Sequence, residues 1–484
     1  MKVSVVVPVF NTGEAIEALI DSLRAQTLPA DAWEAVFVDD GSSDDTADLV
    51  DSLIAEDANM RLLREKPSGW PGRPRNVGLD AAKGDYVFFS DDDDTLGPEA
   101  LQRLTAFADA NHADVVVPRT VGRNRGVPAI TRTVVDAQHE PALIMSSLAP
   151  QKLFRREFLR TAGIRFREGH FRLEDHLFVT TAYLRAERVS TYADYPCYTL
   201  AYRPGRAHIS QQRPDWPAYF ASVRACLDRV DEEARDPEVR RAMRSRWLRA
   251  EALSRLRGDA YAKLHCPELT HEVRQLLIDR YPPAELAHLK PIDHALAMLA
   301  IGGEDDDVAA LAAWESSLQV TSEVRSAQVE ANGTARIELH STLTAAASLP
   351  VVDDERAVLE QVATFVDVGV ELQHVRTKVR RPLAVTHADA VTVAVLAPGE
   401  EPLATGRWRV VALAGEHRSR RRRPVQVVGE LPLEQTFRRA GTRTLRFSQD
   451  DGLILRVRAS APLVPVPLHV RITRRLRRLV PALG

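Results

Sequence analysis

The sequence has few cysteines, no long apolar run and little net charge. Its three cysteines in 484 residues, Cys197, Cys226 and Cys266, fit neither a disulfide scaffold nor a zinc cluster, so we expect a reducing compartment. No apolar run reaches the roughly 20 residues of a membrane-spanning helix. The Val-rich run at residues 3–7 has no signal-peptide pattern before it, so we expect a cytoplasmic protein. The formal net charge of −3 gives no overall attraction to nucleic acid, and we expect none as a partner.

The chain is too long for one ordinary hydrophobic core. The pattern of its apolar residues changes along the sequence and indicates several domains. Residues 1–215 alternate short apolar runs with helical periodicity, which is typical of an α/β domain. Residues 216–317 are helical in pattern and include an Arg-rich helix predicted through residues 247–256. Residues 318–470 contain short apolar runs between turn residues, which predict a β-sandwich, and residues 471–484 form a basic amphipathic tail.

The first domain is predicted to contain a mixed, mostly parallel sheet. The predicted strands are Val3–Val9, Glu34–Asp39, Tyr86–Ser90 and Asp114–Pro118. A helix over residues 13–25 has its apolar side chains at helical spacing, which gives it one face to pack on the sheet. Ligands bind at the carboxyl ends of such strands. We therefore expect the polar segments that follow the first three strands to meet at one edge.

Two aspartates follow the second predicted strand. Asp39 and Asp40 precede Gly41, which lets the chain turn sharply. Carboxylates in this place can accept hydrogen bonds from a nucleotide base or a ribose hydroxyl. The alternative is that this segment is only a turn followed by a helix cap. We expect residues 44–46 to supply that cap. Asp39 and Asp40 are therefore candidates for nucleotide binding.

Four consecutive aspartates, Asp91 to Asp94, follow the third predicted strand. Crowded carboxylates repel one another unless a cation neutralises them, and such oxygen ligands suit Mg²⁺ or Mn²⁺. The alternative is a solvated acidic turn that caps a helix starting near Pro98. The neighbouring motifs favour the metal site.

Two other segments place charged residues in constrained positions. Arg73 and Arg75 lie in a loop rich in Gly and Pro, and guanidinium groups on a stiff loop suit a pyrophosphate. Glu174 and Asp175 begin a predicted helix, whose dipole keeps a carboxylate ionised and able to take a proton. Taken alone, the arginines are explained equally well as solvated surface charges. The two carboxylates are explained equally well as an acidic first turn that stabilises the helix.

In this order the motifs resemble those of family 2 glycosyltransferases with the GT-A fold. The resemblance covers residues 1–215 and implies a nucleotide-sugar donor, a divalent metal and an inverting displacement. A UDP-sugar is the donor we expect. The segments that carry the resemblance are VVVPVFN at 5–11, VDDGSSDDT at 38–46, PRNVG at 74–78, FSDDDD at 89–94 and LEDHLF at 173–178.

The resemblance also implies roles for single residues. Asp175 matches the general base that removes a proton from the acceptor hydroxyl. Glu174 matches the neighbour that orients the acceptor or the base. The resemblance assigns a further set of residues to the base, the ribose or the phosphates of the nucleotide sugar. These residues are Pro8, Val9, Asp39, Asp40, Arg75 and Asp92.

The metal ligands follow from the same resemblance. Asp91 and Asp93 occupy the ends of the family's Asp-x-Asp motif, with Asp93 the stronger candidate for direct coordination of Mn²⁺ or Mg²⁺. This sequence departs from the family pattern because four aspartates run together. A register shifted by one, with Asp92 and Asp94 as ligands, therefore stays open.

The order of domains is similar to that of the wall teichoic acid glycosyltransferases of Gram-positive bacteria. In that group a segment after the base closes over the diphosphate, and Arg206, His208 and Ser210 match it here. Ig-like C-terminal domains or helical appendices mediate trimer formation in that group, so a homo-oligomer is expected, with a trimer favoured. The expected acceptor is a hydroxyl of a glycan or of a polyol-phosphate polymer.

Two other functions stay open at this point. A nucleotidyltransferase that makes the activated sugar also needs a βαβ sheet and acidic metal ligands, although the Glu174-Asp175 pair favours transfer. A catalytically inactive carbohydrate-binding or assembly protein would account for the C-terminal sandwich. The complete set of base, metal and phosphate candidates argues against that inactive protein.

The C-terminal region has two arginine-rich runs. Residues 471–480 place apolar side chains at helical spacing among five arginines. Such a helix suits anionic lipid head groups, which predicts peripheral contact with the inner face of a membrane. Packing of this helix on the sandwich or on a partner subunit is the equal alternative. The second run, at residues 418–423, suits lipid or a polyanionic acceptor.

Overall fold

The computed structural model of the chain describes residues 1–123, 127, 130–201, 213–329 and shorter segments after residue 333. Those segments are 334–345, 369–374, 380–388, 391–396, 406–414, 421–424, 438–440, 443–450 and 452–459. By its internal contacts the chain divides into two compact units. The first unit comprises residues 1–256 and 260–308, and the second comprises residues 257–259 and 309–484.

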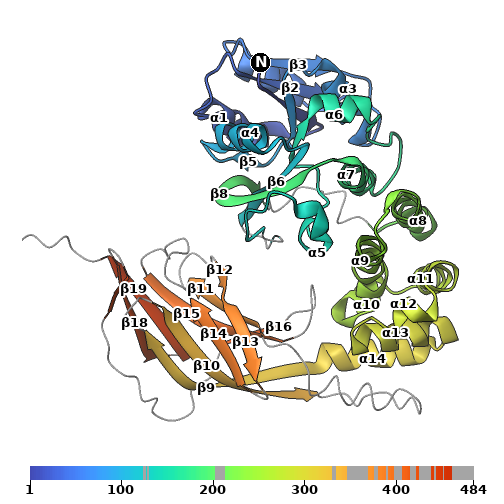
Figure 1. The fold of residues 1–484 in the computed structure, drawn as a ribbon, viewed down its shortest axis with the longest axis vertical. Helices are drawn as coiled ribbons and strands as arrows, with labels where there is room; N and C mark the ends of the chain where they lie inside the picture. The colour runs from blue at the N-terminus through green and yellow to red at the C-terminus, as the bar shows by residue number, and fades with distance from the viewer. Residues whose placement is uncertain are drawn as a thin grey trace, which may run out of the picture. The chain divides into compact units, whose positions relative to one another are not determined.

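A mixed sheet lies at the centre of the first unit, with eight strands among the described residues (Figure 1). The strands are β1 Val3–Val9, β2 Trp33–Asp39, β3 Met60–Arg64, β4 Tyr86–Phe89, β5 Thr95–Leu96, β6 Val115–Arg123, β7 Leu153–Arg155 and β8 Val189–Ala201. Their order is β3-β2-β1-β4-β7-β6-β8-β5. β1 is parallel to β2 and β4, and β7 is antiparallel to β4 and β6. The predicted mixed sheet is confirmed, and the four predicted strands correspond to β1, β2, β4 and β6.

Helices cover both faces of this sheet. They are α1 Glu17–Arg24, α2 Thr46–Ile54, α3 Gly72–Ala81, α4 Ala100–Asn111, α5 Pro141–Ile144, α6 Arg156–Thr161 and α7 Glu174–Arg185, with 3-10 turns at Gly13–Ile16 and Ala137–His139. On one face, Val5 of β1 packs in a core with Leu19 of α1 and Leu104 of α4, all fully buried. On the other face, α3 approaches β1 so closely that a β-carbon at Gly78 would lie 2.3 Å from Val6 Cγ1. Figure 1 shows α3 and α6 across the sheet from α1 and α4.

The helical linker follows the α/β domain. Its helices are α8 Trp216–Glu233, α9 Pro237–Trp247, α10 Gly258–Leu264, α11 Pro267–Arg280, α12 Pro283–Leu286, α13 Pro291–Gly302 and α14 Asp305–Ser317. Asp236 caps α9, and its side chain accepts from the Glu238 backbone N–H at 2.8 Å. The single helix predicted over residues 247–256 is wrong, because α9 gives way to a π-helical segment, Leu248–Ala252, and a 3-10 turn, Leu253–Arg255. The wider turn places the buried Glu251 between two partly buried arginines, a contact that apolar periodicity does not reveal.

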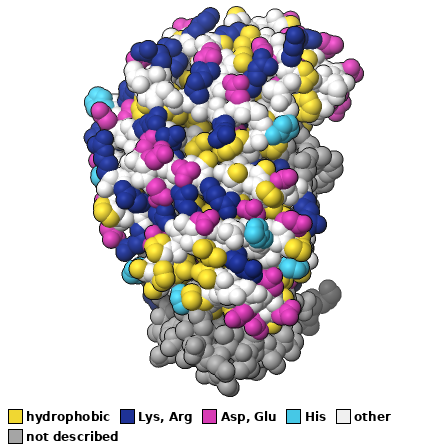
Figure 2. All heavy atoms as spheres, turned by 90° about the vertical axis from the view of Figure 1, so that its right-hand side faces the viewer, with side chains coloured by type: hydrophobic (Ala, Val, Ile, Leu, Met, Phe, Trp, Pro, Cys, Tyr) yellow, Lys and Arg dark blue, Asp and Glu magenta, His cyan; other side chains and the backbone are white. Residues whose placement is uncertain are grey.

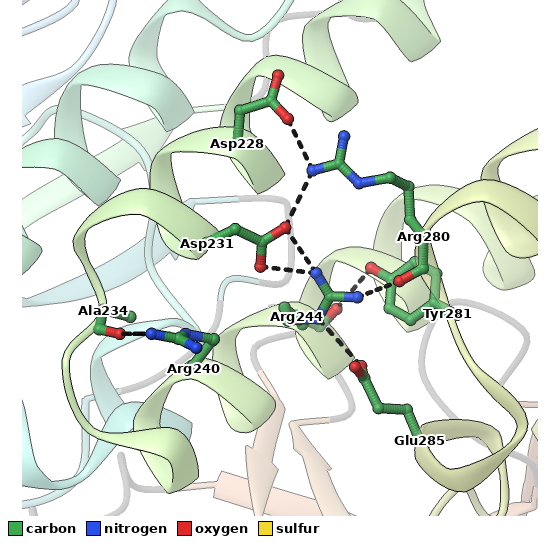
Figure 3. Close-up of polar contacts among 8 residues, drawn as sticks. All are labelled: Asp228, Asp231, Ala234, Arg240, Arg244, Arg280, Tyr281 and Glu285. Carbon is green, nitrogen blue, oxygen red and sulfur yellow. Dashed lines mark hydrogen bonds and ion pairs between the residues drawn. The ribbon is translucent and has the colours of Figure 1, made fainter.

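Ion pairs around the buried Arg244 hold the linker helices together (Figure 3). Arg244 donates to both oxygens of Asp231, at 2.6 and 2.8 Å, and to Glu285 at 3.0 Å. Arg280 extends the network to Asp228 at 2.7 Å and to Asp231 at 3.0 Å. Arg244 is 7% exposed, so loss of its partners would leave a buried charge unpaired, whereas the pair between Arg280 and the half-exposed Asp228 contributes less. The network therefore fixes how α8, α9, α11 and α12 pack.

The second unit contains two antiparallel sheets. Its strands are β9 Leu318–Val329, β10 Ala335–Ala345, β11 Gly369–His374, β12 Arg380–Pro382, β13 Ala384–Ala388, β14 Val391–Leu396, β15 Gly406–Ala414, β16 Arg421–Pro424, β17 Arg438–Ala440, β18 Arg443–Asp450 and β19 Gly452–Ala459. Counting described residues alone, one sheet has the order β13-β14-β10-β9, and the other has β12-β11-β15-β19-β18-β17 with β16 paired to β15. The predicted β-rich region is confirmed. The predicted basic tail, 471–484, lies outside the described residues.

The described surface carries both signs of charge. On the face drawn in Figure 2, basic and acidic side chains are interspersed over the coloured atoms. This mixture agrees with a net charge of −3 for the whole chain. In the part of the chain that the structure describes, no helix combines the length and the apolar character needed to cross a bilayer.

Candidate active site

The ends of three neighbouring strands bring the predicted motifs together. β2, β1 and β4 lie side by side and parallel, so their carboxyl ends share one edge of the sheet. Across this edge the Asn11 backbone N–H donates to Ser42 Oγ at 3.0 Å. The Thr12 hydroxyl donates to Asp92. The first three motifs therefore form one site, as their positions after the strands predicted.

The residues assigned to the nucleotide lie at this edge, mostly buried. Val9 belongs to the core and is 1% exposed, and Pro8 is half-buried. Asp39 accepts hydrogen bonds from two backbone N–H groups of the following turn, each at 3.1 Å. Asp40 accepts from the Ser68 backbone N–H at 3.0 Å and from its hydroxyl at 2.9 Å. Both carboxylates thus shape their loops, and their contact with a nucleotide stays a prediction.

Arg75 links the two sides of the site. The predicted loop is wrong at this point, because Arg73 and Arg75 lie in the first turn of helix α3. The Arg75 side chain is buried, with Nη2 donating to Asp91 Oδ1 at 3.1 Å and Nη1 donating to Glu174 Oε1 at 3.0 Å. The guanidinium also lies 5.3 Å from the centre of the Phe166 ring. The fork geometry of arginine suits two carboxylates at once. The guanidinium of Arg75 therefore joins the aspartate loop to the first turn of α7. Its contact with the nucleotide stays a prediction.

The aspartates of the loop have different partners. Asp91 Oδ2 accepts from the Gln151 side-chain amide at 2.6 Å, while its other oxygen accepts from the guanidinium described above. Asp94 accepts from the Tyr198 hydroxyl at 2.9 Å and from the Ala201 backbone N–H at 2.7 Å. Burial, and next the charge of Asp91, raise the pKa of Asp94 to about 8. The alternative role as a helix cap fails, because Glu99 occupies the N-cap position of α4.

The chemistry of this loop fits a hard divalent cation such as Mg²⁺ or Mn²⁺. Among the described residues, no three His, Cys, Asp or Glu side chains converge into a complete cage. Mg²⁺ sites that act on nucleotides use one or two carboxylates and complete the shell with phosphate oxygens and water. The donor set therefore fits a cation that binds together with a diphosphate. Asp91 and Asp93 stay the predicted ligands, and Asp93 is 8% exposed.

Helix α7 begins with the two predicted catalytic carboxylates. Glu174 is 5% exposed and accepts from the Trp70 indole N–H at 2.9 Å in addition to Arg75. Burial, and next the charge of Asp175, raise the pKa of Glu174 to about 7. Asp175 is half-buried and accepts from the His176 backbone N–H at 2.8 Å. Both carboxylate oxygens of Glu174 are hydrogen-bonded, which suits a residue that orients the acceptor or the base. Asp175 is partly exposed, which suits a general base.

The linker packs behind α7 within the first unit (Figure 1). The ring of His176 lies 5.5 Å from that of Trp247, and His176 Nδ1 lies 4.0 Å from Glu251 Oε1. Glu251, on the π-helical segment, accepts from Arg246 at 2.8 Å and from Arg255 at 3.0 Å. Burial opposes ionisation of this carboxyl, but the neighbouring positive charges hold its pKa at about 2. The first turn of α7 therefore rests on a buried, charged part of the linker.

Two residues of the site had no local signal in the sequence. Gln151 bonds to Asp91, which lies 60 positions away along the chain. Lys152 is fully buried just before β7, where its ammonium donates to Ser147 and Ala149, and the apolar strand after it gives no hint of a buried charge. A contact between distant segments is visible only in the fold. The three residues predicted to close over the diphosphate, Arg206, His208 and Ser210, lie outside the described residues.

The sheet, its covering helices and the strand-edge site define a GT-A fold. A crystal structure of Staphylococcus aureus TarS residues 1–349 in complex with UDP-GlcNAc is similar to this chain, with a TM-score of 0.58 and 29% identity. That similarity covers 64% of this chain and 90% of the other. A longer S. aureus TarS structure is similar in fold over 96% of this chain, with a TM-score of 0.57 at 21% identity.

Sequence comparisons identify the family. The profile described as glycosyl transferase family 2 matches residues 4–176, and that of the glycosyl transferase TarS linker domain matches residues 217–312. The poly(ribitol-phosphate) beta-N-acetylglucosaminyltransferase TarP of S. aureus is 30% identical over 230 residues. That alignment covers 46% of this chain and 70% of TarP. The chain belongs to glycosyl transferase family 2.

Longer relatives match over a similar share of the chain. The poly(ribitol-phosphate) beta-glucosyltransferase of Bacillus spizizenii is 38% identical over 214 residues, or 43% of this chain. S. aureus TarS, described as a poly(ribitol-phosphate) beta-N-acetylglucosaminyltransferase, is 37% identical over 214 residues. The matched part of this chain spans 34% and 37% of these two relatives.

Proposed function

We propose that the chain is an inverting, metal-dependent glycosyltransferase that moves a sugar from a UDP-sugar to a hydroxyl of a polyol-phosphate polymer. The observation that supports this most is the bridge made by Arg75. It joins Asp91 of the donor-side loop at 3.1 Å to Glu174 of the acceptor-side helix at 3.0 Å. Asp175, the next residue of that helix, is therefore held close to the place where donor and acceptor would meet.

The proposed reaction needs one base and one leaving group. Asp175 takes the proton of the acceptor hydroxyl as its oxygen attacks the anomeric carbon. The new bond joins that oxygen to the anomeric carbon, while the bond from this carbon to the diphosphate breaks and UDP leaves with the electron pair. A divalent cation at Asp91 and Asp93 supplies electrostatic stabilisation of the diphosphate. Displacement from the opposite side inverts the centre, so an α-linked donor gives a β-linked product.

The relatives suggest which substrates to test first. Those with 37% and 38% identity are named for transfer of N-acetylglucosamine or glucose to poly(ribitol-phosphate). The match to the glycosyl transferase family 2 profile, residues 4–176, includes the site residues of both the aspartate loop and α7. UDP-GlcNAc and UDP-glucose are therefore the first donors, and poly(ribitol-phosphate) is the first acceptor. A cell-envelope acceptor of this kind would place the enzyme in the cytoplasm, at the inner face of the membrane.

The test is turnover by the full chain with Mn²⁺, poly(ribitol-phosphate) and each of a panel of nucleotide sugars. We expect release of UDP that depends on the acceptor, with a β-linked sugar on the polymer. Formation of a nucleotide sugar and pyrophosphate from a nucleoside triphosphate and a sugar phosphate would support a nucleotidyltransferase instead. Binding of the polymer without turnover of any donor would support an assembly protein.

A further inference from the structure

The segment that leads into α7 carries cationic side chains to which the reaction described above gives no role. Arg167 and His170 are exposed, and Arg172 is half-buried. The segment ends at the first turn of α7, where Glu174 and Asp175 lie. These side chains therefore border the acceptor side of the candidate active site.

Packing on two helices fixes where this segment lies. The buried ring of Phe166 is stacked on that of Phe178 of α7, with ring centres 3.9 Å apart. Asn76 of α3 donates to the Phe166 carbonyl oxygen at 2.9 Å and accepts from its backbone N–H at 3.0 Å. The start of α3 lies so near that a β-carbon at Gly72 would be 2.3 Å from the Arg167 carbonyl oxygen. The segment is therefore held on the two helices that carry the candidate site.

Aromatic rings hold the cationic side chains in place. The Arg167 guanidinium lies 4.5 Å from the centre of the Phe171 ring. The Arg172 guanidinium lies 6.0 Å from the centre of the Trp70 ring, and the His170 ring lies 5.4 Å from that of Trp70. A guanidinium that packs on a ring face keeps its N–H groups in its own plane, where they can reach an anion.

Trp70 connects these side chains to the candidate active site. Its indole N–H donates to Glu174 Oε2 at 2.9 Å. It follows Ser68 and Gly69, whose backbone N–H groups donate to Asp40 at 3.0 and 3.2 Å. The ring is therefore fixed between the donor side and the acceptor side. The residues of this cationic patch are Trp70, Arg167, His170 and Arg172.

The nearby carboxylates on α3 and on the segment itself have other partners. Asp80 pairs with Arg165 through both oxygens, at 2.6 and 2.7 Å. Glu168 accepts from the Asn76 side-chain amide at 2.9 Å. Within the described residues, Arg167 forms no ion pair with a carboxylate. The patch therefore presents positive charge beside the catalytic candidates.

We propose that the cationic patch binds a phosphodiester of the acceptor polymer, next to the hydroxyl that attacks. This inference rests on the proposed function. In a polyol-phosphate chain each hydroxyl is only a few bonds from a phosphodiester, so a hydroxyl at Asp175 brings a phosphate close to that residue. Guanidinium groups bind phosphate oxygens through paired hydrogen bonds, and the Trp70 ring offers an apolar face to the C–H groups of the polyol. A neutral glycan offers these guanidinium groups no anion, so the patch favours the polyol-phosphate acceptor.

The double variant Arg167→Gln with Arg172→Gln tests this in the full chain, since it removes both charges and keeps polar side chains. Binding of poly(ribitol-phosphate) should weaken by roughly 10-fold or more, because charge-assisted hydrogen bonds to phosphate are lost. In turnover assays KM for the polymer should rise by a similar factor, while kcat at saturating polymer stays within a few-fold. The affinity for UDP with Mn²⁺ should not change. Added salt should weaken polymer binding by the parent chain more than by the variant.

Arg165→Gln is the matched control. It removes a positive charge from the same segment, but this charge is already paired with Asp80. Polymer binding by this variant should therefore stay within about two-fold of the parent chain. Free ribitol, an uncharged acceptor, is the second control, because its rate of transfer should be equal in the parent chain and in the double variant.

Equal polymer binding by the parent chain and the folded double variant would overturn the inference. An equal loss in Arg165→Gln, or an equal loss of transfer to free ribitol, would do the same. If the double variant does not fold, the exposed Arg167→Gln alone provides the comparison. Failure of the proposed function looks different. In that case no donor would be turned over, while binding of the polymer and its loss in the variant would still be measurable.

Discussion

At the scale of single residues, the site depends on carboxylates that the protein itself has oriented. Glu174 has one oxygen on Arg75 and the other on Trp70, at 3.0 and 2.9 Å. Asp91 is held in the same way, by Arg75 and Gln151. Such bonds fix the side chains before any substrate binds, which lowers the reorganisation that the reaction needs.

The base is tested by Asp175→Asn. The amide keeps the size of the side chain but cannot take a proton, so kcat should fall by roughly 10²- to 10⁴-fold. The affinity for UDP should change by no more than a few-fold, since the assignment gives Asp175 no part in donor binding. Rates and UDP titrations of the purified variant measure both, and Asp31→Asn on the exposed surface serves as the control. Near-normal turnover would remove Asp175 from this role.

The metal ligands are tested by single alanine substitutions from Asp91 to Asp94. Asp93→Ala should weaken binding of Mn²⁺ and of UDP together, because a cation held by Asp93 would also stabilise the charge of the diphosphate. Calorimetric titration of each variant measures both affinities. Asp94→Ala also removes the acceptor for Tyr198 and Ala201, so its melting temperature must be compared as well.

The opposite pattern would show that the register is shifted by one. In that case Asp92→Ala and Asp94→Ala would each abolish metal-dependent binding of UDP, while Asp91→Ala and Asp93→Ala would not. A loss confined to Asp94→Ala, with a lowered melting temperature, would report damage to the fold rather than to the metal site.

At the scale of elements, the π-helical segment Leu248–Ala252 connects the linker to helix α7. Its wider turn presents Glu251 to Arg246 and Arg255, next to His176 of α7. π-helical turns are uncommon and occur frequently at functional sites. Here the segment supports the first turn of α7, on which the two catalytic candidates lie.

Glu251→Gln tests that support through stability. The folded pKa of Glu251, about 2, is below its ordinary value of 4.5. The charged form therefore stabilises the folded state above about pH 4.5, and this contribution disappears as the pH falls toward 2. We expect the substitution to lower the free energy of unfolding by on the order of 3 kcal/mol at pH 7. The loss should shrink progressively below pH 4.5.

Urea unfolding followed by tryptophan fluorescence measures this effect, because Trp216 and Trp247 lie in the same part of the linker. Glu238→Gln is the control, since its ion pair with Arg241 is largely exposed and should contribute less than about 1 kcal/mol. Equal losses for both variants at pH 7 would contradict the role given to Glu251.

The sequence predicted the parts of the site that follow from local pattern. Strands β1, β2 and β4 are apolar runs, and the polar motifs after them meet because parallel neighbours end at one edge. The contributions of Gln151, Lys152 and Glu251 could not be predicted in this way. Each of these contacts depends on a distant segment of the chain or on an irregular helical turn. Hydrophobic periodicity in the sequence reveals neither of these features.

At the scale of the whole molecule, the basic tail is tested by removing residues 471–484. Its arginines and apolar residues at helical spacing predict salt-sensitive binding to anionic vesicles, which should fall sharply in the truncated chain. Activity on a small soluble acceptor should be retained. Vesicle flotation at low and high salt measures the binding.

Two other results would contradict this role of the tail. Unchanged vesicle binding after truncation would assign the attraction to another surface. Conversion of an oligomer, expected to be a trimer, into monomers would support packing of the tail on a partner subunit. Light scattering of both chains at equal concentration distinguishes these results.

The packing of the linker on α7 decides where the catalytic part of the chain ends. One side of this helix carries Asp175, and its buried side chains include Phe178, Ala182 and Tyr183. The sequence pattern changes at residue 215, but a cut there would remove α8 and the cluster around Glu251 from behind the helix. For anyone preparing a shortened protein, the boundary should therefore lie after the linker, beyond the end of α14 at Ser317, because a cut at residue 308 would divide this helix. Most of the linker therefore belongs to the first compact unit, where it packs on α7 and supports the candidate active site.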